Sequence, residues 1–182
     1  MATLVGRGRM PQADMNPSRV VRHVSSLEEA GVGVWLIGGW AIDALLGEQH
    51  RPHDDLDVLI PDTDVSTAGR VLSGEGYRGA IAAKGATYLV DAAGHQIDVH
   101  VISIRADGAA VYWMEDDDDV WTYPPGALDG RGEVLGQTVR CLSAGMMMLD
   151  HTTGYALDAV HQGDVDALSV AFGIPVPAHR TT

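Results

Sequence analysis

The sequence predicts an α/β (α+β) fold, in which a mixed sheet flanked by helices is followed by a small helical C-terminal part. Short apolar runs with strand character alternate with helical periodicities up to about residue 114, which is typical of a sheet covered by helices. Of the 182 residues, 46% are hydrophobic, which is enough for one domain with a sizeable core. We expect a flexible arm over residues 1–15, the core over 16–114, a loop over 115–132, the helical part over 133–173 and a tail over 174–182.

The first helix is predicted over residues 16–31. Asn16 can cap this helix, Pro17 suits its first position, and Gly31 ends it. Valine and leucine side chains recur along one face of the segment, which favours packing against a sheet. Further helices are expected over 40–49 and 63–76 in the core and over 142–160 and 163–173 near the C-terminus.

The strands are predicted from apolar runs with alternating polarity that end at glycine, proline or aspartate. The clearest of them is "DLDVLI", which Pro61 and Asp62 close. A turn around Ala93 and Gly94 joins two others into a hairpin. The expected strands cover residues 32–37, 55–60, 86–93, 95–104 and 109–114.

The charge balance limits the kinds of partner. The formal net charge is −13, which argues against a nucleic-acid surface and favours a cationic or metal-bridged ligand. A single cysteine, Cys141, excludes an internal disulfide framework and favours a reducing, cytoplasmic setting. No apolar stretch reaches membrane-spanning length and the first 15 residues lack a secretion signal, so we expect no membrane partner. The oligomeric state stays open, with a homodimer among the options.

Three aspartates carry the clearest chemical signal. Side chains alternate between the faces of a strand, so Asp55 and Asp57 share one face while Leu56 and its apolar neighbours point to the core. In "HQIDVHV" the same alternation places Asp98 on a polar face. If the two strands are neighbours, the three carboxylates can hold two Mg²⁺ ions for phosphoryl or nucleotidyl transfer. An ordinary exposed strand face would also explain the first pair alone.

The stretch "LIGGW" is a strand followed by two glycines that open a helix. Such a turn lets backbone N–H groups and a helix N-terminus approach an anionic phosphate. Gly38 and Gly39 are therefore candidate nucleotide contacts. Asp43, in the helix that follows, is expected to tie that helix to the strand rather than to act in catalysis.

The segment "WLIGGWAIDALLGEQHRPHDDLDV" resembles the opening segment of small aminoglycoside and lincosamide nucleotidyltransferases, which belong to the polymerase-β-like superfamily. The pattern of that superfamily is a Gly-Gly pair, then Asp-x-Asp on a strand, then a third Asp on a later strand. Gly38-Gly39, Asp55-x-Asp57 and Asp98 match it in order. The resemblance covers about residues 30–173, and its first half is the more specific.

The resemblance implies a polymerase-β-like core and the transfer of a nucleoside monophosphate from an NTP, with ATP expected, to a hydroxyl of an antibiotic. It implies that Asp55, Asp57 and Asp98 are metal ligands for two Mg²⁺ ions, and that Asp98 also activates the acceptor hydroxyl. Relatives often carry a lysine near the phosphates, but Lys84 is the only lysine here, so we expect Arg51, Arg140 or a histidine such as His53 in that role. The acceptor-contacting residues implied are Asp150, His151, Tyr155 and Asp166.

Two other classes of function stay open at this point. "HDD" also occurs in metal-dependent phosphohydrolases of the His-Asp kind, although their ligands usually sit on helices rather than on an alternating strand. A non-catalytic nucleotide binder, such as an antitoxin-like member of the superfamily, would not need all three aspartates.

Overall fold

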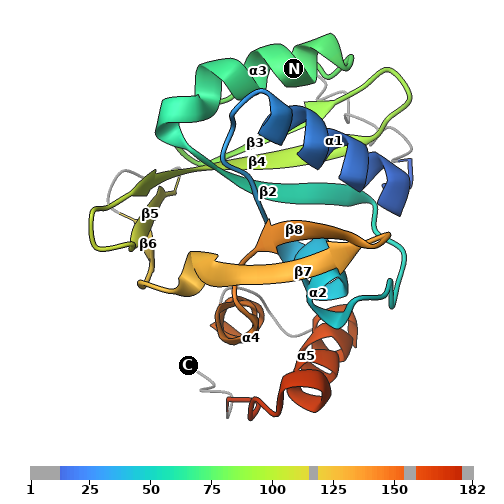
Figure 1. Cartoon of the computed structure of the whole chain (residues 1–182), viewed down its shortest axis with the longest axis vertical. Coiled ribbons are helices and arrows are strands. Elements are labelled where there is room, and N and C mark those ends of the chain that lie inside the picture. Colours follow the sequence, from blue (N-terminus) through green and yellow to red (C-terminus); the bar gives the residue numbers. More distant parts are fainter. Residues whose placement is uncertain (1–12, 115–118, 154–158, 178–182) are drawn as a thin grey trace, which may run out of the picture.

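The computed structural model describes residues 13–114, 119–153 and 159–177, and Figure 1 shows them as a mixed sheet with helices packed around it. The sheet has eight strands in the order β6-β5-β4-β2-β1-β8-β7, with β3 also paired to β4. The strands are β1 (Trp35–Leu36), β2 (Asp55–Pro61), β3 (Ala86–Val90), β4 (Gln96–Ile104), β5 (Ala110–Trp113), β6 (Val120–Tyr123), β7 (Gly130–Val134) and β8 (Gln137–Cys141). The α/β fold class expected from the sequence is confirmed.

Strands β2 and β4 form the parallel pair at the centre of the sheet. Their register places Asp57 opposite Asp98, with Leu56 opposite Ile97 and Val58 opposite Val99. The predicted hairpin is also present, because β3 runs antiparallel along the other edge of β4. The expectation that the two aspartate-bearing strands are neighbours is therefore confirmed.

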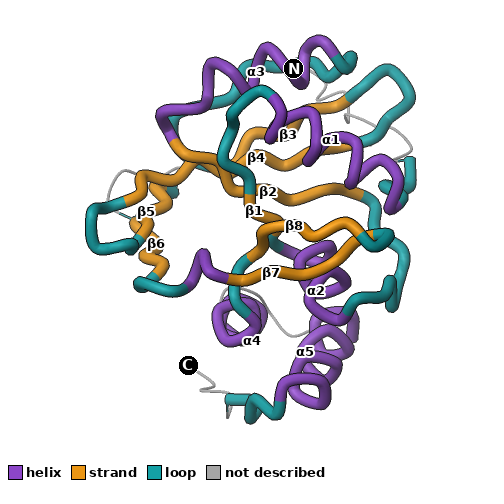
Figure 2. The backbone as a smooth tube through the Cα atoms, viewed as in Figure 1, coloured by secondary structure: helices purple, strands orange, loops and turns teal. Residues whose placement is uncertain are grey.

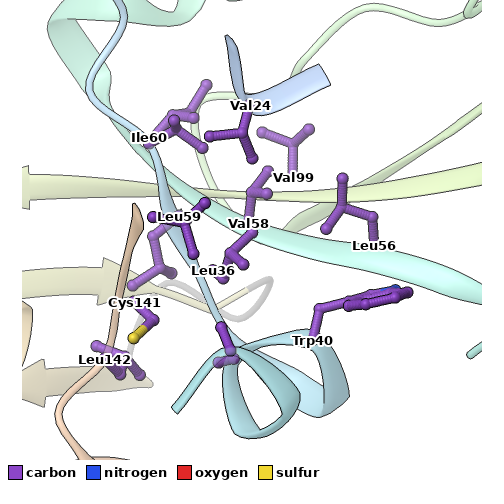
Figure 3. Packing of buried hydrophobic residues seen from close by; sticks show 14 of the residues in the cluster. Val24, Leu36, Trp40, Leu56, Val58, Leu59, Ile60, Val99, Cys141 and Leu142 are labelled. Carbon is purple, nitrogen blue, oxygen red and sulfur yellow. The ribbon is translucent and has the colours of Figure 1, made fainter. Parts of the chain in front are cut away.

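One face of the central strands is covered by α1 (Pro17–Glu29), and the neighbouring α3 (Val65–Gly74) packs beside it after a short 3₁₀ turn, η1 (Asp62–Asp64). The Asn16 side chain accepts a hydrogen bond from the Arg19 N–H, which confirms the predicted cap of the first helix. Figure 3 shows Val24 of α1 with Val58 and Val99 on this face. These side chains are almost completely buried, so the alternation of β2 directs its apolar half into the core.

The opposite face carries α2 (Gly38–Leu46), α4 (Ala144–Thr153) and α5 (Ala159–Phe172). Figures 1 and 2 show these three helices clustered together, with α2 lying between the sheet and α5. The polar side chains of β2 and β4 face the same side. The C-terminal helices are therefore built against the aspartate-bearing face rather than set apart as an appendage.

The prediction of a loop over 115–132 is wrong. Within its described part, residues 120–123 form β6, Ala127–Asp129 form a 3₁₀ turn, η2, and β7 begins at Gly130. Two glycines of this segment, Gly130 and Gly132, allow close packing of the backbone. A Cβ at Gly132 would lie 2.3 Å from the Ala44 backbone of α2, and one at Gly130 would lie 2.3 Å from the Leu142 carbonyl oxygen.

The helical part does not begin at residue 133, as the sequence suggested. Strands β7 and β8 form a hairpin, and β8 joins the main sheet through a parallel pairing of Cys141 with Leu36. The helices start only at Ala144. The tail from residue 174 has no regular structure in its described part, although Ile174 still packs against the core.

The expected arm also ends earlier than predicted. Met15 is 1% exposed, and its N–H donates to the His53 carbonyl at 2.9 Å, while the Ala13 N–H donates to Gly94 at 3.1 Å. Residues 1–12 of that arm, 115–118 of the loop and 178–182 of the tail lie outside the described residues. None of the helices in the described ranges has the length and apolar character needed to cross a bilayer.

Candidate active site

The carboxylates of Asp55, Asp57 and Asp98 lie on one face of the β2–β4 pair. The parallel register sets Asp57 beside Asp98 and Asp55 beside Gln96. The Gln96 side-chain amide donates to Asp98 Oδ1 at 2.7 Å, and His100 Nε2 lies 3.7 Å from Asp57 Oδ1. The strand alternation read from the sequence has therefore brought three acidic groups into one patch.

This patch holds negative charge that the protein itself compensates poorly. Burial, together with the charges of Asp57 and Asp54, raises the pKa of Asp55 to about 6. Burial and the charges of Asp57 and Asp55 raise the pKa of Asp98 to about 7, although the hydrogen bond from Gln96 opposes the shift. Carboxylates that raise one another's pKa in this way favour a cation placed between them.

The patch can bind a divalent cation that takes its remaining ligands from water and from a substrate phosphate. In the described part of the chain, no three Asp, Glu, His or Cys side chains form a ready-made metal site. Mg²⁺ is usually held by one or two carboxylates together with water and substrate phosphates, not by a closed cage of protein ligands. The Asp55–Asp57 pair, with Asp98 beside it, therefore suits an ion that arrives with a phosphate ligand.

The glycine turn lies directly against Asp57. Gly38 has φ = +60°, and a Cβ there would come within 2.4 Å of Asp57 Oδ2, so a side chain is excluded by both conformation and space. The Ile37 N–H donates to the Asp57 carbonyl at 3.1 Å and fixes the turn to β2. Ile37 provides no side-chain cap for α2. The first N–H groups of that helix are thus available to an anion at the carboxylate patch.

Arg51 and His53, which the sequence assigned to the phosphates, lie behind the turn and are engaged by other groups. Arg51 donates to both carboxylate oxygens of Asp164, at 2.9 and 2.8 Å. His53 Nε2 lies 2.5 Å from Asp43 Oδ2, which agrees with the expected role of Asp43 in tying the helix to the strand. Neither side chain lines the cavity in front of Asp57.

A cavity of about 440 Å³ opens in front of Asp57 and Gly38. Its walls come from strands β2 to β6, from the start of α2 and from α4, and most of the lining residues are aromatic or apolar. Several lining residues were not expected as site residues, namely Ile37, Ala86, Tyr88, His100, Tyr112, Met114, Trp121, Tyr123 and Met147. The strands that carry Tyr88 and Tyr112 were predicted, but their place in the cavity wall depends on strand pairing, which a local sequence pattern does not specify.

The structure places only some of the expected acceptor-contacting residues at the cavity. Asp150 and His151 of α4 line the cavity. Burial raises the pKa of Asp150 to about 7 and lowers the pKa of His151. Tyr155 lies outside the described residues. Asp166 is exposed on α5 and accepts a hydrogen bond from Gln162 at 2.8 Å, so it is not part of the cavity wall.

The acidic residue of α5 that reaches toward the site is Asp164. It is fully buried, whereas Asp166 faces solvent. Helical periodicity indicates this burial, because Asp164 lies four residues before the buried Leu168 and next to the buried Val165, on the apolar face of the helix. A carboxylate on the apolar stripe of a helix must meet a partner inside the protein.

A family model described as aminoglycoside-2''-adenylyltransferase matches residues 19–168. Among curated proteins, the 2''-aminoglycoside nucleotidyltransferases of Escherichia coli and Klebsiella pneumoniae are each 45% identical to this chain over 38 residues. That stretch is 21% of this chain and 22% of each relative, so the alignment spans about a fifth of their length.

Two solved structures share the fold across most of their length. The lincosamide antibiotic adenylyltransferase LnuA, solved with lincomycin bound, aligns with a TM-score of 0.74 and 21% identity over 86% of this chain and 98% of that one. ANT(2'')-Ia in complex with adenylyl-2''-tobramycin aligns with a TM-score of 0.69 and 19% identity, over 86% and 89%. The nucleotidyltransferase fold expected from the glycine and aspartate pattern is thereby confirmed.

Proposed function

Because this chain belongs to the aminoglycoside-2''-adenylyltransferase family, we propose that it transfers a nucleoside monophosphate from an NTP, with ATP as the expected donor, to a hydroxyl of a small-molecule antibiotic. The acceptor oxygen forms a bond to the α-phosphorus, the bond from that phosphorus to the β-phosphate oxygen breaks, and pyrophosphate leaves. The proposed setting is the cytoplasm.

The observation that carries the proposal is the juxtaposition of the carboxylate patch with the open end of α2. Asp57 stands opposite Asp98 in the parallel register, and Gly38 lies against the Asp57 side chain. An acidic patch alone would repel a triphosphate. An acidic patch that can hold a cation, next to free helical N–H groups, offers both partners that a triphosphate needs.

Asp55 and Asp57 are the proposed ligands of Mg²⁺, shared with the triphosphate, and Asp98 is a proposed ligand of a second Mg²⁺. When bound, Mg²⁺ would supply positive charge that neutralises the phosphates and the departing pyrophosphate. The pKa values of Asp55 and Asp98, raised to about 6 and about 7, support this assignment because burial and the neighbouring carboxylates both disfavour the ionised forms in the metal-free protein.

Asp98 is the proposed proton acceptor for the acceptor hydroxyl. It is 6% exposed, lies beside Asp57 and is oriented by the hydrogen bond from Gln96. The N–H groups after Ile37 hold the phosphates in place while the hydroxyl approaches.

The acceptor is proposed to bind in the aromatic cavity. Tyr88, Tyr112 and Trp121 offer ring faces to a sugar or to an alkyl group, and aromatic faces also attract cations. Asp150 lies in the same wall and can pair with an ammonium group. Such a cavity suits an amine-bearing antibiotic of the aminoglycoside or lincosamide class.

The test is incubation of the protein with each NTP, Mg²⁺ and a panel of aminoglycosides and lincosamides, with pyrophosphate measured and the antibiotics analysed by mass spectrometry. We expect pyrophosphate release that requires both Mg²⁺ and an acceptor, together with an antibiotic heavier by one nucleoside monophosphate. Asp54→Asn serves as a control variant that should keep this activity, because Asp54 is exposed and precedes the first residue of β2.

Other outcomes would replace the proposal. Phosphate release that needs no acceptor would indicate a phosphohydrolase. Nucleotide binding without turnover for any acceptor would indicate a non-catalytic binder.

A further inference from the structure

A partly buried ionic cluster joins three separate parts of the chain behind the glycine turn. It consists of Asp43 of α2, His50, Arg51 and His53 of the segment before β2, and Asp164 of α5, and we call it the Arg51–Asp164 cluster. His50 Nε2 lies 2.7 Å from Asp164 Oδ1, and the His50 ring also contacts Asp43. Arg51 Nη1 lies 2.9 Å from His53 Nδ1, which completes a closed circuit from α2 to α5.

The two carboxylates of the cluster are almost inaccessible to water. Asp43 is 2% exposed and Asp164 is 0% exposed. Burial by itself would raise the pKa of Asp164, but the hydrogen bonds and charge of Arg51, with His50, lower it overall. The bond to Asp164 also raises the pKa of Arg51. Both partners are therefore held charged, and removing either would leave a buried charge without its counter-ion.

One end of the cluster forms the floor beneath the glycine turn. A Cβ on Gly39 would lie 2.3 Å from His53 Nδ1 and 2.7 Å from Arg51 Nη2. The imidazole of His53 also lies against the Trp40 ring, with 4.8 Å between ring centroids. The position of the first turn of α2 is thus set by side chains that Asp164 holds in place.

The other end of the cluster reaches the aromatic cavity. His151 Nδ1 of α4 lies 3.9 Å from Asp164 Oδ2, and His151 lines the cavity wall. Asp164 therefore contacts Arg51, which lies beneath the glycine turn, and His151, which lies in the cavity wall. It does so from α5, a helix that contributes no residue to the cavity lining itself.

We propose that Asp164 is a positioning residue. Through Arg51 and His53 it fixes the position of the Gly38–Gly39 turn, where a triphosphate would bind, and through His151 it fixes the part of the cavity wall formed by α4. The identity of the two ligands rests on the proposed function. Arg51 is suited to this task because its planar guanidinium binds both oxygens of Asp164 at once, which fixes an orientation that a lysine ammonium cannot fix.

Two variants separate positioning from simple charge. Asp164→Asn keeps a polar group of similar shape but removes the charge that Arg51 requires. Arg51→Lys keeps the charge but loses the two-point contact. Glu28→Gln is the control, because it removes an arginine–carboxylate pair of the same kind, Arg140 with Glu28 at 3.1 Å, which joins α1 to β8 away from the site.

The first readout does not require activity. The Ile37 N–H donates to the Asp57 carbonyl and the Ala41 N–H donates to the Ile37 carbonyl, so hydrogen exchange of these two amides reports the turn. We expect both amides to exchange roughly tenfold faster in Arg51→Lys and Asp164→Asn, as a local opening would produce, and to be unchanged in Glu28→Gln. Unchanged exchange in Arg51→Lys would overturn the proposal, whether or not Asp164→Asn folds.

The second readout uses turnover by the full-length protein. In Arg51→Lys the KM for the NTP should rise roughly tenfold while the KM for the acceptor stays near the wild-type value. A small displacement of the glycine turn is enough to weaken nucleotide binding by such a factor. In Asp164→Asn both KM values should rise. A loss of kcat with both KM values unchanged would contradict the proposal. Absence of turnover in the wild type would count against the proposed function alone, because hydrogen exchange would still test the positioning role.

Discussion

At Gly38 the backbone has φ = +60° and lies directly opposite the Asp57 carboxylate. Alanine at this position would be strained and would also push Asp57 Oδ2 out of the patch. We expect Gly38→Ala to lose more than about 1 kcal/mol of stability and nearly all transfer activity. Gly31→Ala is the matched control, because Gly31 has φ = +82° with no atom near its missing Cβ; it should show the conformational cost with activity per folded molecule preserved.

Asp55 and Asp57 should be indispensable for transfer and dispensable for folding. Asp55→Asn and Asp57→Asn each remove a proposed metal ligand, and neither carboxylate contributes to the apolar core. We therefore expect no measurable pyrophosphate release, with a thermal midpoint in metal-free buffer equal to that of the wild type or higher. Asp54→Asn should be mild. Turnover near the wild-type rate in either of the first two variants would rule out this metal site.

The pH dependence of metal-free stability follows from Asp98. Its folded-state pKa is raised to about 7, so its contribution favours folding below its unfolded pKa and is lost as the pH rises toward 7. Asp98→Asn removes this penalty. We expect the variant to exceed the wild type by on the order of 2 kcal/mol at pH 8 in the presence of a chelator, with the difference shrinking as the pH falls. Chemical unfolding at several pH values measures it, and a difference independent of pH would contradict the assignment.

Among the elements, β3 tests the proposed acceptor cavity with the least disturbance to the core. Tyr88 is 61% exposed and lines the cavity, whereas Val90, on the same face of the same strand, is 37% exposed and does not line it. We expect Tyr88→Ala to raise the acceptor KM roughly tenfold, in line with the loss of an aromatic contact, and to leave the affinity for the nucleotide unchanged. Val90→Ala should alter neither, and equal effects of the two variants would place the acceptor elsewhere.

The elements that the sequence predicted well are those with a strong local signal. Asn16 and Pro17 mark the start of α1, and the alternation of β2 and β4 placed Asp57 and Asp98 on one face. Strand β7 was missed because Gly130 and Gly132 are typical of loops, although Gly132 allows β7 to approach α2. Strand β8 was missed because its residues fell within the part expected to be helical. Close contact between distant backbones leaves no signature in a single segment.

The same limit explains which site residues were found. Asp55, Asp57 and Asp98 belong to a compact motif, so their grouping was predictable. The pairing of Arg51 with Asp164 was not predictable, because the two residues are 113 positions apart and the sequence pointed to Asp166 of the same helix instead. Side-chain pairing across such a separation depends on the packing of α5 against α2, which the sequence pattern does not specify.

Considered across the entire chain, the charge distribution agrees with the proposed chemistry. The net charge of −13 arises from 25 acidic and 12 basic residues, and the carboxylate patch adds local repulsion that the fold tolerates. Functional sites are where proteins accept such costs. Cations, supplied as metal ions with the triphosphate and as ammonium groups of the acceptor, would relieve that repulsion in the working complex.

The most direct test of nucleotidyl transfer at this patch is a comparison of binding and turnover in Asp98→Asn. Titration with Mg·ATP measures binding. Pyrophosphate release in the presence of an antibiotic that the wild-type protein modifies measures turnover, in the same preparation. We expect measurable Mg·ATP affinity, because Asp55, Asp57 and the α2 N-terminus remain, and no pyrophosphate, because the proton acceptor and third carboxylate are gone. Turnover at the wild-type rate would contradict the account, since Asp98 would then be an ordinary strand residue.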